Sequence, residues 1–565
     1  MTTFSTPVAI VGGGPVGLML ALFLDRHGVR CVVFNAEAGV RHHPKGSTHN
    51  ARTMEHYRRL GFADRIRALG LPLDHPTDVA YFTRFNGWEL ARLRFPSEKE
   101  KLATRAKSAA TDQTPEPIHR ANQMYVEAVL FEQAASRPNI TLRFGTSVES
   151  FEQDACGVTF RVRAASGQPE EAWQSSYLVG CDGGRSTVRR ALGIQYVGYE
   201  ALKQAFFGGR MVSTHIRAPN LYRDVLGTRR AWQYWVVNPE LRTAMVPLNG
   251  RDEFLLWTRG DPEDTNTPAI AEVLRQCAGM SVEVEVLDSS PWTAGVALHA
   301  DRFGEGRVLL AGDAVHLFTP TGGFGMNTGV EDAANLAWKL AAMVQGWGGP
   351  GLLNSYEVER KAIAIRNTAA ARDLARSVGE VKVPPELEHA TAEGEAARAE
   401  VGRFLATFGE EFASLGVQLG ARYDGSPIIL PDGQPPVDDL VSYVPSSVPG
   451  GRAPHLWLDA GRGPGSSLFD RLGIGFTLLR LGPDAPDADA FVTGATALGI
   501  PLTELAISDP VARDLYGCDL ALVRPDQHIA WRGSQVPAEI EAILAKVVGH
   551  DAAVAQNRSD GSKAA

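Results

Sequence analysis

The sequence has few cysteines and no excess of basic residues. Its 565 residues include five cysteines, and none of them form a Cys-x-x-Cys pair. This scarcity excludes a disulfide framework and a cysteine-based metal site, and it fits a reducing cytoplasm, so we expect no metal. Lys and Arg total 56 against 65 Asp and Glu, a net charge of −9. No electrostatic drive toward nucleic acid or an anionic membrane is therefore expected.

Long hydrophobic runs are also lacking. The one long uncharged stretch, residues 1–24, carries Gly12-Gly13-Gly14-Pro15 at its centre, which would break a membrane helix. It begins Met-Thr-Thr-Phe, without the positive region that opens a signal peptide. With 44% hydrophobic and 21% charged residues, the chain has the composition of a soluble globular protein, which we expect in the cytoplasm.

A βαβ unit is predicted at the start of the chain. Residues 8–11 form an apolar strand, 18–27 a helix and 29–34 a second strand, with Gly12-x-Gly14-x-x-Gly17 between the first strand and the helix. Gly12 permits a tight turn, Gly14 a close approach of a pyrophosphate, and Gly17 close packing of helix on strand. The pattern predicts a dinucleotide site. Its ribose ligand is either Asn35 or Glu37, at the end of the second strand.

Three further blocks carry a family resemblance. Residues 177–189 (YLVGCDGGRSTVR) resemble the DG motif of the single-component, class A FAD-dependent aromatic hydroxylases. Residues 309–316 (LLAGDAVH), continued by 320–327 (PTGGFGMN), resemble the GD motif of the same family, and 353–360 (LNSYEVER) is also typical of it. With the glycine triplet, the blocks stand in the family's order from Val8 to about Arg366.

The resemblance implies an α/β fold. It comprises a Rossmann-like FAD-binding domain (1–385) with an inserted β-sheet substrate domain (roughly 75–115 and 190–300), as in p-hydroxybenzoate hydroxylase. A helical segment and linker (386–453) follow, and then a domain (454–550) that resembles the thioredoxin-like domain of phenol hydroxylases and a flexible tail (551–565). The C-terminal domain has one cysteine, Cys518, so we expect it to be redox-inactive and to serve packing or dimer contacts. The oligomeric state is left open, with a homodimer preferred.

The resemblance also implies which residues hold FAD. Asp313 and Asp182 would bind hydroxyl groups and backbone near the cofactor, and the start of the helix after Gly325 would stabilise charge on the flavin. Lys45 stands where the family usually has an arginine. The expected set is Gly12, Gly14, Pro15, Val16, Gly17, Glu37, Lys45, Gln123, Asp182, Arg185, Asp313, Gly323, Gly325, Met326 and Asn327.

In this family NADH or NADPH reduces the flavin and O2 forms a flavin C4a-hydroperoxide, which transfers one oxygen atom to a phenolic or polycyclic aromatic ring. Related phenol hydroxylases often deprotonate the phenol with an Asp or His, but that position holds Ser47. His49 and Tyr234 are candidates for the catalytic role, and Trp235 for substrate contact. The sequence does not decide the base.

Two other functions remain as alternatives. Flavin halogenases and reductases share the fold, but the Trp-x-Trp-x-x-Pro setting of a halogenase is lacking. A non-catalytic flavin-binding protein is the other alternative, and the intact glycine triplet, Asp182 and Asp313 argue against it.

Overall fold

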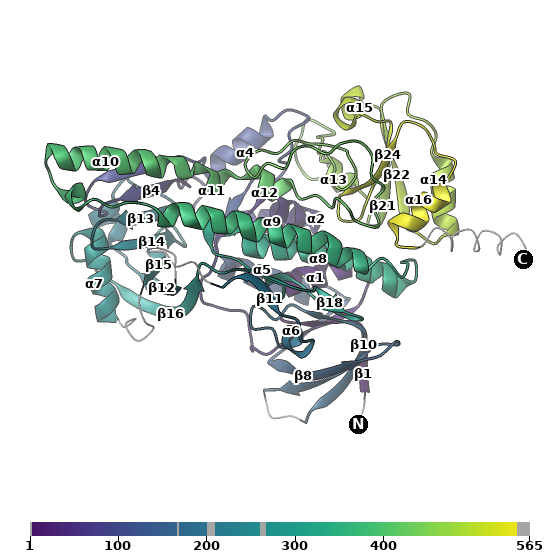
Figure 1. Cartoon of the computed structure of the whole chain (residues 1–565), viewed down its shortest axis with the longest axis horizontal. Coiled ribbons are helices and arrows are strands. Elements are labelled where there is room, and N and C mark those ends of the chain that lie inside the picture. Colours follow the sequence, from purple (N-terminus) through teal and green to yellow (C-terminus); the bar gives the residue numbers. More distant parts are fainter. Residues whose placement is uncertain (1–2, 166–168, 201–208, 260–266, 551–565) are drawn as a thin grey trace, which may run out of the picture.

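The computed structural model describes residues 3–165, 169–200, 209–259 and 267–550 (Figure 1). The tail that we expected to be flexible, 551–565, lies outside these residues. No helix within the described ranges is long and apolar enough to cross a membrane.

The first sheet carries the predicted βαβ unit. Its central strand β1 (Thr3–Val11) pairs in parallel with β2 (Cys31–Asn35) on one side and with β10 (Glu171–Gly180) on the other. The full order is β18-β19-β10-β1-β2-β7, and β8 and β9 form a hairpin on β10. The remaining bounds are β7 (Ile140–Phe144), β8 (Thr146–Gln153), β9 (Val158–Ala164), β18 (Gly304–Glu305) and β19 (Val308–Leu310).

Buried helices cover this sheet because their faces toward it are apolar. Helix α1 (Pro15–Arg26) begins with proline, which suits a first helical turn, and its residues 17–24 are all buried. It packs against α5 (Gln123–Ala135) and α8 (Phe324–Gln345). Helix α9 (Asn354–Gly379) crosses the molecule between its two ends in Figure 1. The other helices near the sheet are α2 (Ala51–Arg59), α3 (Ala63–Arg67) and α6 (Thr187–Ala191).

The inserted sheet lies at the opposite end from the C-terminal domain (Figure 1). Its order is β16-β12-β15-β14-β13-β4-β5, so strands from two distant parts of the chain pair within it. The strands are β4 (Val79–Phe82), β5 (Glu89–Leu93), β12 (Gly209–Arg217), β13 (Gln233–Val237), β14 (Arg242–Pro247), β15 (Glu253–Arg259) and β16 (Glu285–Ala294). Helices α4 (Glu98–Ala106) and α7 (Thr267–Ala278) belong to the same stretches of chain.

Two small sheets connect the layers. One pairs β3 (Thr48–His49) with β6 (His119–Arg120), and the other has the order β11-β17-β20. Its strands are β11 (Tyr196–Tyr199), β17 (Ala297–Ala300) and β20 (His316–Leu317). The segment predicted as helical forms α10 (Ala392–Leu405), α11 (Glu410–Ala413) and α12 (Leu415–Leu419). Helix α10 packs on β5, which brings this segment to the inserted sheet.

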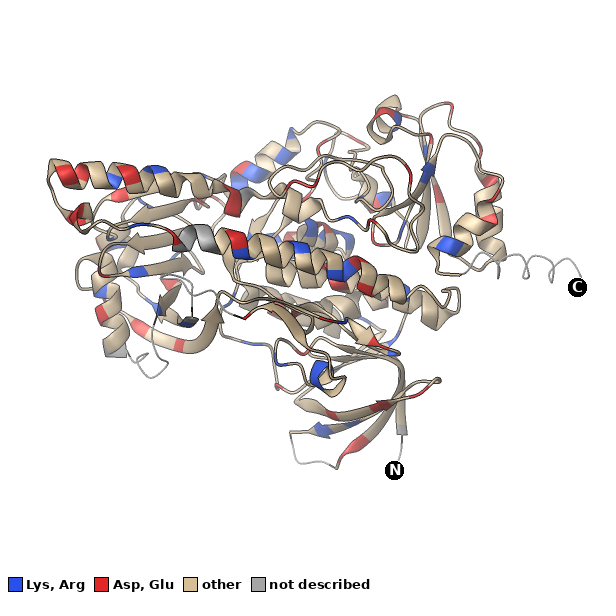
Figure 2. Cartoon of the chain, viewed as in Figure 1, with Lys and Arg blue, Asp and Glu red and all other residues tan. Residues whose placement is uncertain are grey.

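The C-terminal domain is an α/β unit, as predicted. Its sheet has the order β22-β21-β23-β24, with β21 and β22 parallel. The strands are β21 (Phe476–Leu481), β22 (Leu502–Ile507), β23 (Leu520–Val523) and β24 (Ile529–Gly533), and the helices are α13 (Leu468–Arg471), α14 (Asp489–Ala497), α15 (Pro510–Tyr516) and α16 (Ile540–Val547). Cys518 is buried here. Charges of both signs are spread along the chain, without a basic segment (Figure 2).

Candidate functional site: a dinucleotide cleft and a tryptophan cavity

A cleft of about 380 Å³ opens where β1, β2 and β10 end, and we call it the dinucleotide cleft. Gly12 has a φ of +111°, and a Cβ at this position would lie 2.3 Å from the Cys181 carbonyl oxygen. A Cβ on Gly17 would lie 2.0 Å from the Gly12 carbonyl oxygen, whereas a Cβ on Gly14 would meet nothing within 4 Å. Gly12 and Gly17 thus meet steric demands of the fold, and Gly14 faces the open cleft beside Pro15 and Val16.

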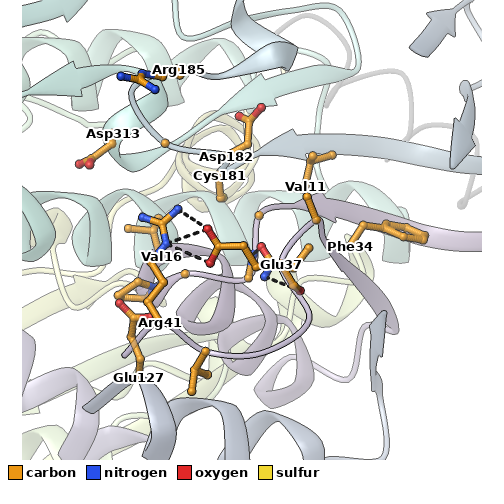
Figure 3. A pocket seen from close by; sticks show the side chains of 18 of the residues that line it. Val11, Val16, Phe34, Glu37, Arg41, Glu127, Cys181, Asp182, Arg185 and Asp313 are labelled. Atoms are coloured by element: carbon orange, nitrogen blue, oxygen red, sulfur yellow. Dashed lines mark hydrogen bonds and ion pairs between the residues drawn. The ribbon is translucent and has the colours of Figure 1, made fainter. Parts of the chain in front are cut away.

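The two candidate ribose ligands both line this cleft but are engaged differently. The Asn35 side chain holds the glycine turn, because its Oδ1 accepts the Gly13 N–H at 3.1 Å and its Nδ2 donates to the Glu37 carbonyl at 3.2 Å. The Glu37 carboxylate instead accepts from Arg41 at 2.9 and 3.1 Å, at the surface of the cleft (Figure 3). Asn35 is thus committed to the glycine turn, whereas Glu37 is paired with an exposed arginine, and the choice between them as ribose ligand stays a prediction.

Asp182 stands across the cleft from Glu37 (Figure 3). Its Oδ2 accepts the backbone N–H groups of Thr187 and Val188 at 2.7 and 3.2 Å, so Asp182 supports the first turn of α6. Its Oδ1 is buried and has no hydrogen-bond partner among the described residues. Such an atom is costly unless a ligand supplies a donor. Asp182 therefore combines a structural role with an open position toward the cleft, and Arg185 is exposed beside it.

Lys45 and Gln123 complete this wall. Lys45 lines the cleft from the loop before β3, and Gln123 lines it from the start of α5. The Gln123 amide donates to Glu127 at 2.6 Å, and Glu127 also lines the cleft. Burial raises the pKa of Glu127, which the hydrogen bond from Gln123 and the charges of Lys45 and Arg41 oppose.

The GD block is held by buried ion pairs. Asp332 accepts the Gly312 N–H at 3.1 Å, the His316 ring at 2.7 Å and the Arg360 guanidinium at 2.8 Å, and His316, Asp332 and Arg360 are all fully buried. These contacts fix the turn that presents Asp313, whose side chain is exposed to the cleft. His316 therefore has a structural role. It is not among the residues that line the dinucleotide cleft or the larger cavity beside it.

The residues predicted at the start of α8 divide into two groups. Met326 lines the dinucleotide cleft, and Gly323 lines a larger adjoining cavity that is described below. Gly325 and Asn327 line neither. The Asn327 amide instead fastens the loop, donating to the carbonyls of Thr48 and Gly323 at 3.0 and 2.7 Å and accepting the Asn50 N–H at 3.0 Å. Its buried position makes Asn327 a positioning residue for the glycine loop.

A second and larger cavity, of about 750 Å³, adjoins the dinucleotide cleft, and we call it the tryptophan cavity. Four tryptophans on or directly beside the inserted sheet line it: Trp232, Trp235, Trp257 and Trp292. The wall shared by both spaces consists of Arg41, Lys45, Asp182, Gly183, Arg185 and Asp313. The glycine loop, Arg120 and Glu411 line the tryptophan cavity as well. A ligand in this cavity would lie directly against whatever the cleft binds.

The structure separates the candidates for catalysis. Trp235, the candidate for substrate contact, lines the tryptophan cavity. Tyr234, the next residue on β13, points to the other face, where it packs with Phe82 and Phe85 and accepts the Ala231 N–H at 2.8 Å. Successive side chains of a strand point to opposite faces, so the two cannot share one cavity. Tyr234 does not contact this site.

His49 also lies outside both cavities. It is fully buried, and its ring nitrogens face the Tyr57 hydroxyl at 3.2 Å and the Ala121 carbonyl oxygen at 3.1 Å. Burial lowers its pKa to about 3, and the charge of Arg120 acts in the same direction. The segment that carries His49 is extended, but His49 points into the core, whereas Ser47 lines the tryptophan cavity. His49 is therefore not placed to take a proton from a ligand.

Comparisons with known proteins agree with this geometry. Residues 5–371 match the family of the FAD binding domain, and residues 446–550 match the C-terminal domain of aromatic-ring hydroxylases. The chain is 33% identical to a putative polyketide hydroxylase of Streptomyces halstedii, over 95% of both chains. The chain belongs to the FAD-dependent aromatic-ring hydroxylases.

Solved structures support the same assignment for the fold. The rebeccamycin biosynthetic enzyme RebC with reduced flavin is 35% identical, with a TM-score of 0.86, and the match covers 97% of this chain and all of that one. Aklavinone-11 hydroxylase, solved with FAD and aklavinone, is 30% identical, with a TM-score of 0.78 and coverage of 97% and 100%. The predicted FAD-binding fold with an inserted sheet and a C-terminal domain is confirmed.

The residues of this hydroxylase fit FAD. Gly14 leaves room at the start of α1, where free N–H groups attract phosphate. The Asp182 Oδ1, which has no partner within the described part of the chain, can accept a hydrogen bond from a hydroxyl group. Sequence reasoning missed several residues of the tryptophan cavity, namely His43, Arg120, Trp257, Trp292 and Glu411. They come from separate segments without a shared motif, so no local signal reports them.

Proposed function

We propose that this hydroxylase uses NADPH or NADH and O2 to add one oxygen atom to a phenolic, polycyclic aromatic substrate held in the tryptophan cavity. The observation that carries this proposal is the tryptophan cavity of about 750 Å³, which four tryptophans line and which shares a wall with the dinucleotide cleft. This volume lies within the range of sites for drug-sized ligands, and indole rings favour flat aromatic partners.

In this proposal the chain's own residues bind the substrate and the cofactor, orient them toward each other and exclude water from the space between them. Bound and reduced FAD supplies activated oxygen for transfer to an electron-rich ring. Trp232 and Trp235 are only 6% and 2% exposed, which supports a dry wall around the substrate. Arg41, Lys45 and Arg185 on the shared wall place positive charge where the phosphates of FAD or of a nicotinamide cofactor can approach.

The proposal is tested with the purified, FAD-loaded enzyme and a panel of phenols, naphthols and hydroxylated anthraquinones. We expect multi-ring phenols to accelerate oxidation of NADPH or NADH and to gain the mass of one oxygen atom, because the cavity is too large for a single ring to fill. Peroxide is measured in parallel as a control for uncoupled oxidation. Acceleration by single-ring phenols alone, or peroxide without an oxygenated product from any compound, would contradict the proposed substrate class.

A further inference from the structure

Glu411 brings a carboxyl group into the tryptophan cavity from a part of the chain far from the FAD motifs. It lies on α11, in the connection between α9 and the C-terminal domain, and its exposed fraction is only 6%. Glu411 also lines a second, smaller cavity of about 170 Å³, together with exposed Glu380 and Glu410. Glu411 thus stands between the proposed substrate site and a smaller cavity that exposed acidic residues line.

The hydrogen bonding of Glu411 is incomplete. Its Oε1 accepts the Gly322 N–H at a long 3.4 Å, which connects it to the glycine loop beside the cofactor cleft. Its Oε2 is buried and has no hydrogen-bond partner in the described part of the chain. A buried polar atom left unpaired destabilises the protein, and this cost falls when a ligand supplies the partner. The Oε2 atom of Glu411 is therefore suited to accept a hydrogen bond from a hydroxyl group of a substrate.

Charged and titratable groups reach Glu411 from several elements. Arg120 on β6 and Tyr81 on β4 face it from the core, and Glu380 and Glu410 lie on its outer side. Burial raises the pKa of Glu411 to about 8, although the Gly322 N–H and Arg120 oppose the shift. Burial also raises the pKa of Tyr81, which leaves its hydroxyl neutral.

Arg120 supplies the positive charge at the same end of the cavity. Its guanidinium lies 3.8 Å from the centre of the Trp232 ring and donates to the Thr48 hydroxyl, and no carboxylate is paired with it in the described ranges. Burial lowers the pKa of Arg120 to about 9, so it remains a cation at neutral pH. A buried cation without a counter-ion favours an anionic ligand atom.

We propose that Glu411 is a catalytic residue that accepts the proton of a substrate hydroxyl, and that Arg120 stabilises the oxyanion left behind. In this step the O–H bond of the phenol breaks, the proton bonds to a Glu411 carboxylate oxygen, and the electron pair stays on the substrate oxygen. No oxidant is consumed. The proton then returns to solvent by way of the smaller cavity. The inference rests on the proposed function and defines its substrates as phenols whose hydroxyl lies at this end.

The main test compares Glu411→Gln with wild type on β-naphthol and on its methyl ether, both with the FAD-loaded enzyme. We expect kcat/KM for the naphthol to fall about 100-fold just above pH 8, where wild-type Glu411 is ionised and can accept a proton, which is the usual size of a general-base contribution. The difference between the two proteins should shrink below pH 8, where wild-type Glu411 is itself protonated, and again as the pH approaches the phenol's own pKa of about 10. The ether has no proton to lose, so its rate should change less than about threefold. Glu411→Asp should restore part of the naphthol rate.

Controls separate this role from a structural one. Glu400→Gln makes the same change at an exposed position of α10 and should match wild type. An equal loss with the naphthol and the ether, or a Glu411→Gln naphthol rate within about threefold of wild type across the pH range, would overturn the assignment.

Infrared titration of the substrate-free holoenzyme gives a readout without turnover. We expect a protonated carboxyl band that ionises near pH 8 in wild type and is lacking in Glu411→Gln. If wild type oxygenates no phenol of the panel, the proposed function fails, and the infrared result then decides for or against Glu411 by itself. Identical spectra of the two proteins would overturn the assignment.

Discussion

Gly14→Ala yields a folded protein that has lost most of its FAD, whereas Gly17→Ala yields a protein that is itself destabilised. The two glycines lie on the same turn but meet different surroundings. A Cβ on Gly14 meets no protein atom within 4 Å and projects into the cleft, at the start of α1 where phosphate would approach. A Cβ on Gly17 would lie 2.0 Å from the Gly12 carbonyl oxygen and force helix and strand apart.

We expect Gly14→Ala to weaken FAD binding about 100-fold, which corresponds to about 2.7 kcal/mol, with an unfolding temperature equal to that of wild-type apoprotein. The measurements are the flavin-to-protein absorbance ratio after gel filtration and thermal melting with and without added FAD. Gly409→Ala, at a position outside the cleft where a Cβ also meets nothing within 4 Å, is the matched control. Normal FAD content in Gly14→Ala would show that the cofactor does not approach this turn.

Glu359→Gln lowers the free energy of unfolding by about 3–5 kcal/mol, because it removes the counter-ion of buried Lys339 and one of the two counter-ions of buried Arg524. Glu359 on α9 accepts from Lys339 at 2.6 Å and from Arg524 at 2.7 and 2.9 Å, and all three are fully buried. Arg524 belongs to the C-terminal domain and also pairs with Asp526 at 2.6 Å. The cluster joins that domain to the FAD-binding domain, so its loss loosens their contact.

The pH dependence follows from the direction of the Glu359 shift. Burial alone would raise the pKa of Glu359, but the charges of Arg524 and Lys339 outweigh it and hold the pKa well below the ordinary 4.5. The folded-state pKa is depressed, so the stabilisation is complete above 4.5 and is lost as the pH falls further. The difference between wild type and Glu359→Gln should therefore shrink in acid. Chemical denaturation at several pH values measures it.

The exposed Glu541 of α16 gives the matched control, since Glu541→Gln removes one charge from the C-terminal domain without touching the cluster. It should unfold as wild type does. A Glu359→Gln protein that is as stable as Glu541→Gln at neutral pH would contradict the role given to the cluster.

Local sequence reasoning predicted the parts of the site that follow from contiguous motifs. The glycine triplet shapes the dinucleotide cleft because a tight βαβ turn needs glycine at the same positions whatever surrounds it. Asp182 lines the same cleft from the end of β10. Side-chain direction was harder to predict. Trp235 reaches the cavity and Tyr234 does not. The sequence could not indicate which face of β13 meets the cavity, because this depends on the pairing of β13 with β4 and β14.

Contacts between residues far apart in the chain could not be predicted from the sequence. Arg120 and Glu411 are almost 300 residues apart, and only the packing of the α10–α12 segment against the inserted sheet brings both to one cavity. Likewise, nothing local in Arg524-Pro525-Asp526 indicates that the fold buries both of its charges and pairs Arg524 with Glu359 of α9. A charged residue in a helix-rich linker carries no local mark of such a position, because burial depends on distant segments.

The central claim is that this hydroxylase transfers oxygen from O2 to an aromatic ring bound beside FAD. Turnover of a multi-ring phenol under isotopically heavy O2, followed by mass spectrometry of the product, tests it most directly. The account predicts that the product gains one heavy oxygen atom, and that NADPH or NADH is consumed in equal amount. A product whose added oxygen comes from water, or a product without added oxygen, would contradict it.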